Sequence, residues 1–122
     1  MLNCLFVALG GAVGSVLRYL VGLIPVSEKC LFPIKTFSIN VAGCLLICLI
    51  VALAAKSPLL NPRFVLFLKV GLCGGFTTYS TFALESSDLL KSAHWGIAAA
   101  YVAVSIVMGV GEVFLGEWAG EK

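Results

Sequence analysis

The stretch that decides the fold is GLCGGFTTYSTF, residues 71–82. It lies inside a long apolar segment, yet two adjacent glycines are followed by four Ser/Thr residues in five positions. Glycine loses much conformational freedom in a helix, and Ser and Thr compete for backbone hydrogen bonds, so this composition disfavours a continuous helix. Irregular backbone at membrane depth is tolerated only inside protein or beside a polar cavity. We therefore expect a helix that is broken in the middle of a membrane span.

The composition around this stretch is typical of an all-α membrane protein. Hydrophobic residues make up 61% of the 122 residues and charged residues only 11%, whereas a soluble domain has about 25% charged residues. A soluble enzyme and a disordered chain are both disfavoured. Because a spanning helix needs about 20 mostly apolar residues, the chain fits one domain, residues 1–122. Its four predicted spans are roughly 2–24, 36–55, 64–87 and 94–116.

The basic residues are divided almost evenly between the two sides of the predicted membrane. The two groups are Lys29, Lys35 and Lys91 on one side, and Lys56, Arg63 and Lys122, with Lys69 nearest to them, on the other. The net charge is only +2 and no basic run occurs, so nucleic-acid binding has no support. Since a Lys/Arg bias normally orients a membrane protein, this balance predicts insertion in both orientations.

Several polar residues fall inside the first two spans. Gly10, Gly14, Arg18 and Gly22 are spaced four apart, so they share one helix face. Small residues at that spacing permit close helix approach. We expect Arg18 to point into protein or a water-filled vestibule; the alternative is that it snorkels to the headgroups. Asn40 should face the interior, either as a link between helices or as a hydrogen-bond donor on a pathway.

The fourth span carries Tyr101, Ser105 and Gly109 on one face. These hydroxyls could line a path for water or an ion, or they could bond back to carbonyls of their own helix. No carboxylate pair, Ser/His/Asp constellation or phosphate-binding loop with a lysine is present, so an enzyme is disfavoured.

Four motifs, in order over nearly the whole chain, resemble the Fluc, or CrcB-type, bacterial fluoride channels. They are Gly10-Gly11-x-x-Gly14 with Arg18-Tyr19, Thr36-x-x-x-Asn40-x-x-Gly43, the run from Gly74 to Phe82 with Glu85, and the Tyr101/Ser105 stripe. The third motif is specific, and the others would be weak alone. Two positions depart from the family: Tyr79 stands where phenylalanine is usual, and Gly109 where a hydroxyl is often found.

The resemblance implies a fold and a function. Such proteins have four helices per subunit, dual topology, and an antiparallel dimer with two pores. The implied function is passive, fluoride-selective export across the cell (inner or plasma) membrane, which relieves fluoride toxicity. A homodimer is expected, and a heterodimer with a homologous subunit is the alternative.

The resemblance also implies site residues. A structural sodium ion at the dimer centre would be held by backbone carbonyls of Gly74 and Thr77 from both subunits. The implied fluoride pathway contains Asn40, Phe82, Tyr79, Thr36, Tyr101, Ser105 and Thr81. Asn40 would donate to fluoride, and the two rings at 79 and 82 would present their electropositive edges. Arg18 and Lys69 would supply positive charge in a vestibule.

Two other classes remain as alternatives. A proton-coupled efflux transporter of the small multidrug type depends on a carboxylate in its first span, but residues 1–27 contain no Asp or Glu. A non-transporting subunit of a membrane assembly would need only the glycine-rich faces. It would leave the Ser/Thr-rich break without an explanation.

Overall fold

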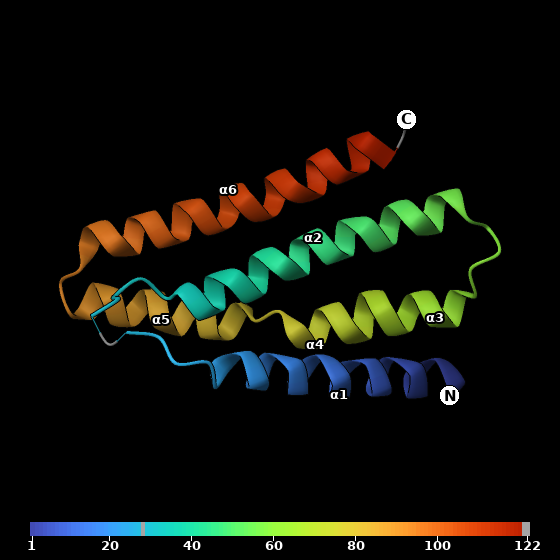
Figure 1. The fold of residues 1–122 in the computed structure, drawn as a ribbon, viewed down its shortest axis with the longest axis horizontal. Helices are drawn as coiled ribbons and strands as arrows, with labels where there is room; N and C mark the ends of the chain where they lie inside the picture. Colours follow the sequence, from blue (N-terminus) through green and yellow to red (C-terminus); the bar gives the residue numbers. More distant parts are fainter. Residues whose placement is uncertain (28, 121–122) are drawn as a thin grey trace.

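The computed structural model describes residues 1–27 and 29–120, and in this part of the chain it is helical without strands (Figure 1). The elements are α1 (Leu2–Gly22), α2 (Ile34–Lys56), α3 (Pro62–Leu66), the π-helical segment η1 (Phe67–Cys73), α4 (Gly74–Phe76), α5 (Tyr79–Lys91) and α6 (Trp95–Gly120). Lys122, one of the counted loop charges, lies outside the described residues.

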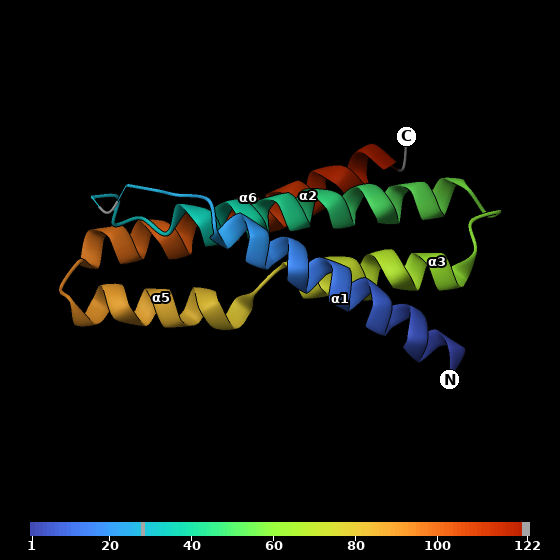
Figure 2. The same cartoon turned by 60° about the horizontal axis from the view of Figure 1, so that its bottom comes forward.

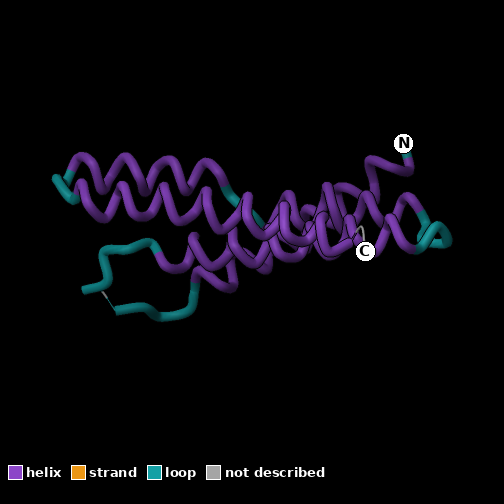
Figure 3. The backbone as a smooth tube through the Cα atoms, turned by 90° about the horizontal axis from the view of Figure 1, so that it is seen from above, coloured by secondary structure: helices purple, strands orange, loops and turns teal. Residues whose placement is uncertain are grey.

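The helices form four roughly antiparallel passes along one long axis (Figure 1). The third pass is made of α3, η1, α4 and α5 in series. Turning the molecule shows α1 crossing this pass and α6 lying beside α2 (Figure 2), and the main helix contacts are those of α1 with η1 and α4, and of α2 with α6. The loops gather at the two ends (Figure 3).

Three of the four predicted spans are single helices. Within the described ranges, α1, α2 and the part of α6 from Trp95 to Trp118 are long and apolar enough to cross a membrane. The predicted third span, 64–87, is instead divided among α3, η1, α4 and α5, and each of these is too short to cross alone.

Proline marks two of the helix starts. Pro33 is the N-cap of α2, so that helix begins two residues before the predicted span. Pro62 is in the first turn of α3, and the Asn61 side-chain oxygen accepts a hydrogen bond from the Arg63 N–H at 2.9 Å. At both starts proline lacks an N–H that would have no helical partner anyway, and only α3 has a side-chain cap.

No glycine or proline marks the end of α5 in the sequence, and the backbone shows how the helix ends without one. Ala93 has a positive φ of 63°, a conformation for which glycine is usual at a helix end. The His94 N–H donates to the Leu89 carbonyl at 2.9 Å, and the Ala93 N–H donates to the Leu90 carbonyl at 3.1 Å. These bonds give the last carbonyls of α5 their partners without a glycine. The helix ends at Lys91, beyond residue 87, where the predicted span ended.

The glycine face of α1 packs directly on the backbone of η1 and α4. A Cβ atom at Gly10 would overlap the Phe67 carbonyl, and one at Gly14 would overlap the Leu72 carbonyl. The close approach predicted for these two glycines is therefore confirmed. Gly22, on the same helix face, has open space where a Cβ atom would lie and is not part of this contact.

We expect Gly14→Ala to destabilise the protein by about 1–3 kcal/mol, because the added methyl group has to displace backbone rather than a flexible side chain. Gly22→Ala is the matched control, with the same change on the same helix but no neighbouring atom within 4 Å. Unfolding of the purified variants by titration with sodium dodecyl sulfate measures the difference. Equal stability of the two variants would contradict the packing described here.

Candidate functional site

The centre of the site is an interruption between α4 and α5. Thr77 (φ −79°, ψ 158°) and Thr78 (φ −146°, ψ 111°) are extended. The Asn40 carboxamide, on α2, holds this segment with two hydrogen bonds: the Thr78 N–H donates to Asn40 Oδ1 at 2.8 Å, and Asn40 Nδ2 donates to the Thr78 carbonyl at 3.1 Å. Asn40 therefore links α2 to the interruption, which is the first of the two roles expected for it.

Threonine side chains close the helix ends on either side. The Thr77 N–H and its hydroxyl both donate to the Cys73 carbonyl, at 3.0 and 2.8 Å. Thr78 is the N-cap of α5: its hydroxyl oxygen accepts from the Thr81 N–H at 3.1 Å. Ser and Thr suit these positions because their oxygens replace missing helical partners.

Because of these bonds, two main-chain carbonyls, those of Gly74 and Thr77, lose the N–H donors that they would have in a continuous helix. The Thr78 N–H would serve the Gly74 carbonyl four residues earlier, but it is bonded to Asn40. The Thr81 N–H would serve the Thr77 carbonyl, but it is bonded to the Thr78 side chain. The interruption thus leaves the carbonyls of residues 74 and 77 without their helical donors.

Glycine at position 43 makes room for the interruption on the α2 side. A Cβ atom there would overlap the Thr77 methyl group, and it would lie 3.7 Å from a Phe76 ring carbon. The spacing of Gly43 three residues after Asn40 places both on the face of α2 that meets the third pass.

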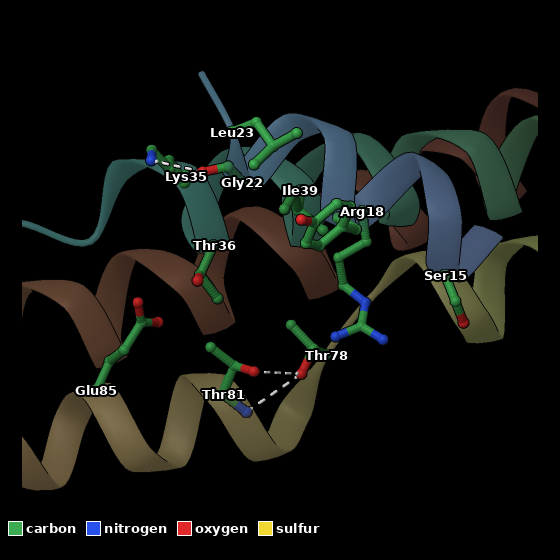
Figure 4. Close-up of a pocket in the computed structure, with 11 residues that line it drawn as sticks. Ser15, Arg18, Gly22, Leu23, Lys35, Thr36, Ile39, Thr78, Thr81 and Glu85 are labelled. Carbon is green, nitrogen blue, oxygen red and sulfur yellow. Dashed lines mark hydrogen bonds between the residues drawn. The ribbon is translucent and has the colours of Figure 1, made fainter. Parts of the chain in front are cut away.

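A cavity of about 440 Å³ opens beside the interruption, between α1, α2 and α5 (Figure 4). Its polar lining includes residues that the sequence analysis assigned to the pathway or vestibule, Arg18, Thr36 and Thr81. Thr78, which Asn40 holds, also lines it. The cavity therefore brings hydroxyl donors and one guanidinium together at the edge of the extended segment.

Arg18 points inward rather than to the membrane surface. Its Nε donates to the Gly75 carbonyl at 3.1 Å, and Figure 4 shows the side chain reaching from α1 toward Thr78. A cation is favoured at the carboxyl end of a helix such as α4, where carbonyls lack partners. The inward orientation expected from the glycine face is confirmed.

An aromatic cluster lies on the α6 side of α5. The Tyr101 side chain is fully buried (0% exposed), and its ring centroid is 5.0 Å from that of Phe82 and 5.4 Å from that of Phe32. The Tyr101 hydroxyl donates to Glu85 Oε1 at 3.0 Å. Because Glu85 also lines the 440 Å³ cavity, this bond connects the cluster to the cavity.

Tyr79 begins the same cluster but faces outward. Its ring centroid is 6.1 Å from that of Phe82, and 81% of its surface is exposed in the single subunit. The two rings are close, as their spacing predicted. The hydroxyl that distinguishes this chain from the usual phenylalanine is thus on the surface.

Two predicted site residues lie elsewhere. Ser105 lines a different cavity, of about 520 Å³, together with Cys44 and Gly109. Its hydroxyl has no hydrogen-bond partner among the described residues, so it does not bond back to its own helix. Lys69 lies in a groove near Ala54 and Pro58, away from the cavity that contains Arg18.

Sequence reasoning did not assign most of the cavity's lining residues to the site, and Thr78, Ser15 and Lys35 are among those it missed. Thr78 belongs to the motif that marks the break, so its side chain could have been proposed as the cap of the next helix. Lys35 was counted only as a loop charge, but its Nζ donates to the Gly22 carbonyl at 2.8 Å and so caps α1. Ser15 gave no signal beyond its position on α1.

Gly74 has a backbone that any residue can adopt. Its φ of −63° and ψ of −38° are ordinary helical values. A Cβ atom there would meet nothing within 4 Å, and the residue is exposed. Nothing within the described part of this subunit requires glycine at position 74.

We expect Asn40→Ala to loosen the interruption, because the buried N–H and carbonyl of Thr78 would lose their partner. Each group left unsatisfied costs about 1–3 kcal/mol. Unfolding by detergent titration should show this loss, while Ser38→Ala, an exposed change on the same helix, should unfold like the parent. If Asn40→Ala is as stable as Ser38→Ala, the carboxamide does not hold the segment.

Comparison with known proteins gives a consistent result over almost the full chain. A family model described as "CrcB-like protein, Camphor Resistance (CrcB)" matches residues 5–117. A protein of Methylobacillus flagellatus is 45% identical over 118 residues, covering 95% of this chain and 92% of that protein. One of Phocaeicola vulgatus is 42% identical over 122 residues, covering 99% and 100%. Each is named "Fluoride-specific ion channel FluC".

Proposed function

The chain belongs to the CrcB family, and from that premise we propose that it is a fluoride-selective channel of the cell membrane. It would let fluoride leave the cell passively and so relieve fluoride toxicity. The family is one of channels rather than of enzymes. The observation that carries the proposal is the 440 Å³ cavity, where Arg18 and threonine hydroxyls surround an interrupted helix.

The donors of this region suit a small, strongly hydrated anion. A pore that conducts such an ion has to replace its water with close donors, yet bind it weakly enough to release it. The cavity offers hydroxyls at Thr36, Thr78 and Thr81. The guanidinium in its lining, that of Arg18, donates from Nε to the Gly75 carbonyl, and its other N–H groups and its charge would attract the anion.

Asn40 can serve the anion as well as the protein. A carboxamide nitrogen carries two hydrogens, and one of them is used on the Thr78 carbonyl. The second is left for fluoride. Its orientation is set by the two bonds to Thr78, so the donor would be held in place before the ion arrives, and little would have to be reorganised as it passes.

Beyond Asn40, the proposed path follows the aromatic rings and the face of α6. Phe82 and Tyr79 would present positive ring edges to the anion. The buried Tyr101 and the unpartnered Ser105 would extend the polar track. In this subunit the Tyr101 hydroxyl donates its proton to Glu85, so Tyr101 would contact the ion through its ring edge.

We also propose that two copies pair in opposite orientations around Gly74. The exposed surface and open space at this glycine fit a close approach by a second copy, since small residues let membrane helices touch. In such a pair, the Arg18 end of one copy and the Lys69 end of the other face the same side of the membrane. Both basic residues could then draw anions into one vestibule.

A structural sodium ion fits the same place. Within the described residues, no group of three His, Cys, Asp or Glu side chains could hold a metal, so a cation would need main-chain oxygens. The carbonyls of Gly74 and Thr77, whose helical donors are diverted, are of the kind that coordinate sodium in broken membrane helices. Bound there from both copies, the ion would stabilise the pairing.

The experiment that tests the proposed function is fluoride efflux from liposomes containing the purified protein. Fluoride should leave rapidly down its gradient, and chloride should not leave at a comparable rate. Liposomes that release neither ion, or both equally, would show that the proposed function is wrong.

We expect Phe82→Ile to reduce fluoride efflux by roughly an order of magnitude, because an aliphatic side chain fills the space but has no positive edge. Tyr79→Phe is the control: it keeps the ring and changes only an exposed hydroxyl, so efflux should stay near that of the parent. Gel filtration checks that both variants keep the parent's size. Parent-like efflux of Phe82→Ile would mean that this ring is only packing.

Gly74→Val should prevent pairing without unfolding the subunit, since the new side chain meets nothing in its own chain. Gly96→Val adds the same side chain at another glycine with open space, on α6, and should leave the pairing intact. The two are compared by circular dichroism for helix content and by cross-linking in liposomes for dimers. A Gly74→Val protein that pairs like Gly96→Val contradicts the proposed interface.

A further inference from the structure

One face of α6 combines two small residues with two unpartnered polar groups. Ser105, Gly109, Glu112 and Gly116 follow one another at spacings of four, three and four residues, so they lie in one row along the helix. Tyr101 precedes Ser105 by one further turn. Glu112 therefore continues the row that the proposed fluoride path follows.

This face lies against α2. A Cβ atom at Gly109 would be 3.2 Å from Cys44 Sγ, and one at Gly116 would be 2.6 Å from Cys48 Sγ. Because Glu112 lies between these two glycines, its side chain leaves α6 at the seam with α2. The cavity of about 520 Å³ that Ser105 and Gly109 line is in the same region.

Among the described residues, two buried side-chain oxygens lack any hydrogen-bond partner, and both are in this row: Ser105 Oγ and Glu112 Oε2. They are seven residues apart, about 10.5 Å along the helix. Buried polar groups almost always have partners, and one that lacks them calls for an unseen water or ion. Two such groups lie in a single row, and one of them, Ser105, lines a cavity, which indicates a path occupied by something other than protein.

The surroundings of Glu112 do not favour a charged carboxylate. The titratable groups that α2 presents to this seam are the thiols of Cys44 and Cys48, and no basic side chain is paired with Glu112 in the described chain. The other helix packed on α6 is α5, whose charged residues Glu85, Asp88 and Lys91 lie toward the opposite end (Figure 1). An unpaired charge in a membrane interior is costly.

We propose that Glu112 carries a proton while the channel conducts and donates it as a hydrogen bond to the passing anion or to its water. The inference rests on the proposed function. Gly109 leaves the row without a hydroxyl one turn after Ser105, and the acid group at 112 supplies the next donor. Loss of the proton would turn this donor into a negative charge on an anion path. Fluoride flux should therefore fall as the pH rises through the titration of this one carboxyl.

The first measurement is fluoride efflux from liposomes between about pH 6 and about pH 9, the range in which buried carboxyl groups are known to titrate. The parent should lose flux by about tenfold or more when the carboxylate forms, since a buried like charge repels the anion strongly. Glu112→Gln keeps an N–H donor that cannot ionise, so it should conduct throughout this range without the fall. Glu112→Ala should conduct poorly at every pH.

Glu117→Gln is the matched control, because Glu117 is an exposed glutamate on the same helix and lines the 520 Å³ cavity. It should keep the pH response of the parent. A Glu112→Gln channel that retains the fall in flux at high pH would overturn the proposal. So would a fall that Glu117→Gln removes.

The second measurement does not depend on transport. Infrared spectra of the reconstituted parent at neutral pH should contain a protonated-carboxyl band that is missing in Glu112→Gln and present in Glu117→Gln. If the band is absent from the parent, Glu112 is ionised and the proposal is wrong, whether or not the protein conducts. If the band is present but no liposome releases fluoride, the proposed function is wrong. Glu112 is then protonated but is not a donor on a fluoride path.

Discussion

Much of the structure depends on one pair of hydrogen bonds, those between the Asn40 carboxamide and the backbone of Thr78. An amide side chain matches a peptide group donor for acceptor, so it can substitute for helical bonds that the chain gives up. Two extended residues can then sit among packed helices without exposing unpaired groups. The same bonds take the Thr78 N–H away from Gly74, so the interruption and its free carbonyl have one cause.

Of the two roles expected for Asn40, the structure shows the link between helices. The ion contact proposed for it would use the same side chain. Here the residue that fixes the interruption touches Thr78, which itself lines the cavity. In the proposed channel, the same carboxamide would support this segment and donate its second N–H to the anion.

The sequence predicted the elements that depend on local chemistry. The length of the apolar segments predicted the passes. The Gly-Gly-Phe-Thr-Thr run predicted an interruption, and Thr77 and Thr78 are extended there. It could not predict that Asn40 meets Thr78, 38 residues away, because that contact depends on how α2 packs. Nor could it place Lys69 and Arg18 in separate cavities, since residues in different passes meet only in three dimensions.

The π-helical winding of η1 (Phe67–Cys73) bears on how the chain tolerates changes in length. Each π-type hydrogen bond spans one more residue than an α-type bond, so such a segment amounts to an insertion absorbed into a helix. Removing one residue from 67–73 would let this pass wind as a regular α-helix. The parts before and after the deletion would then keep nearly the same facing, because the extra residue is what the π winding takes up. Alignments and designed chimaeras in this family should therefore be anchored separately on either side of η1.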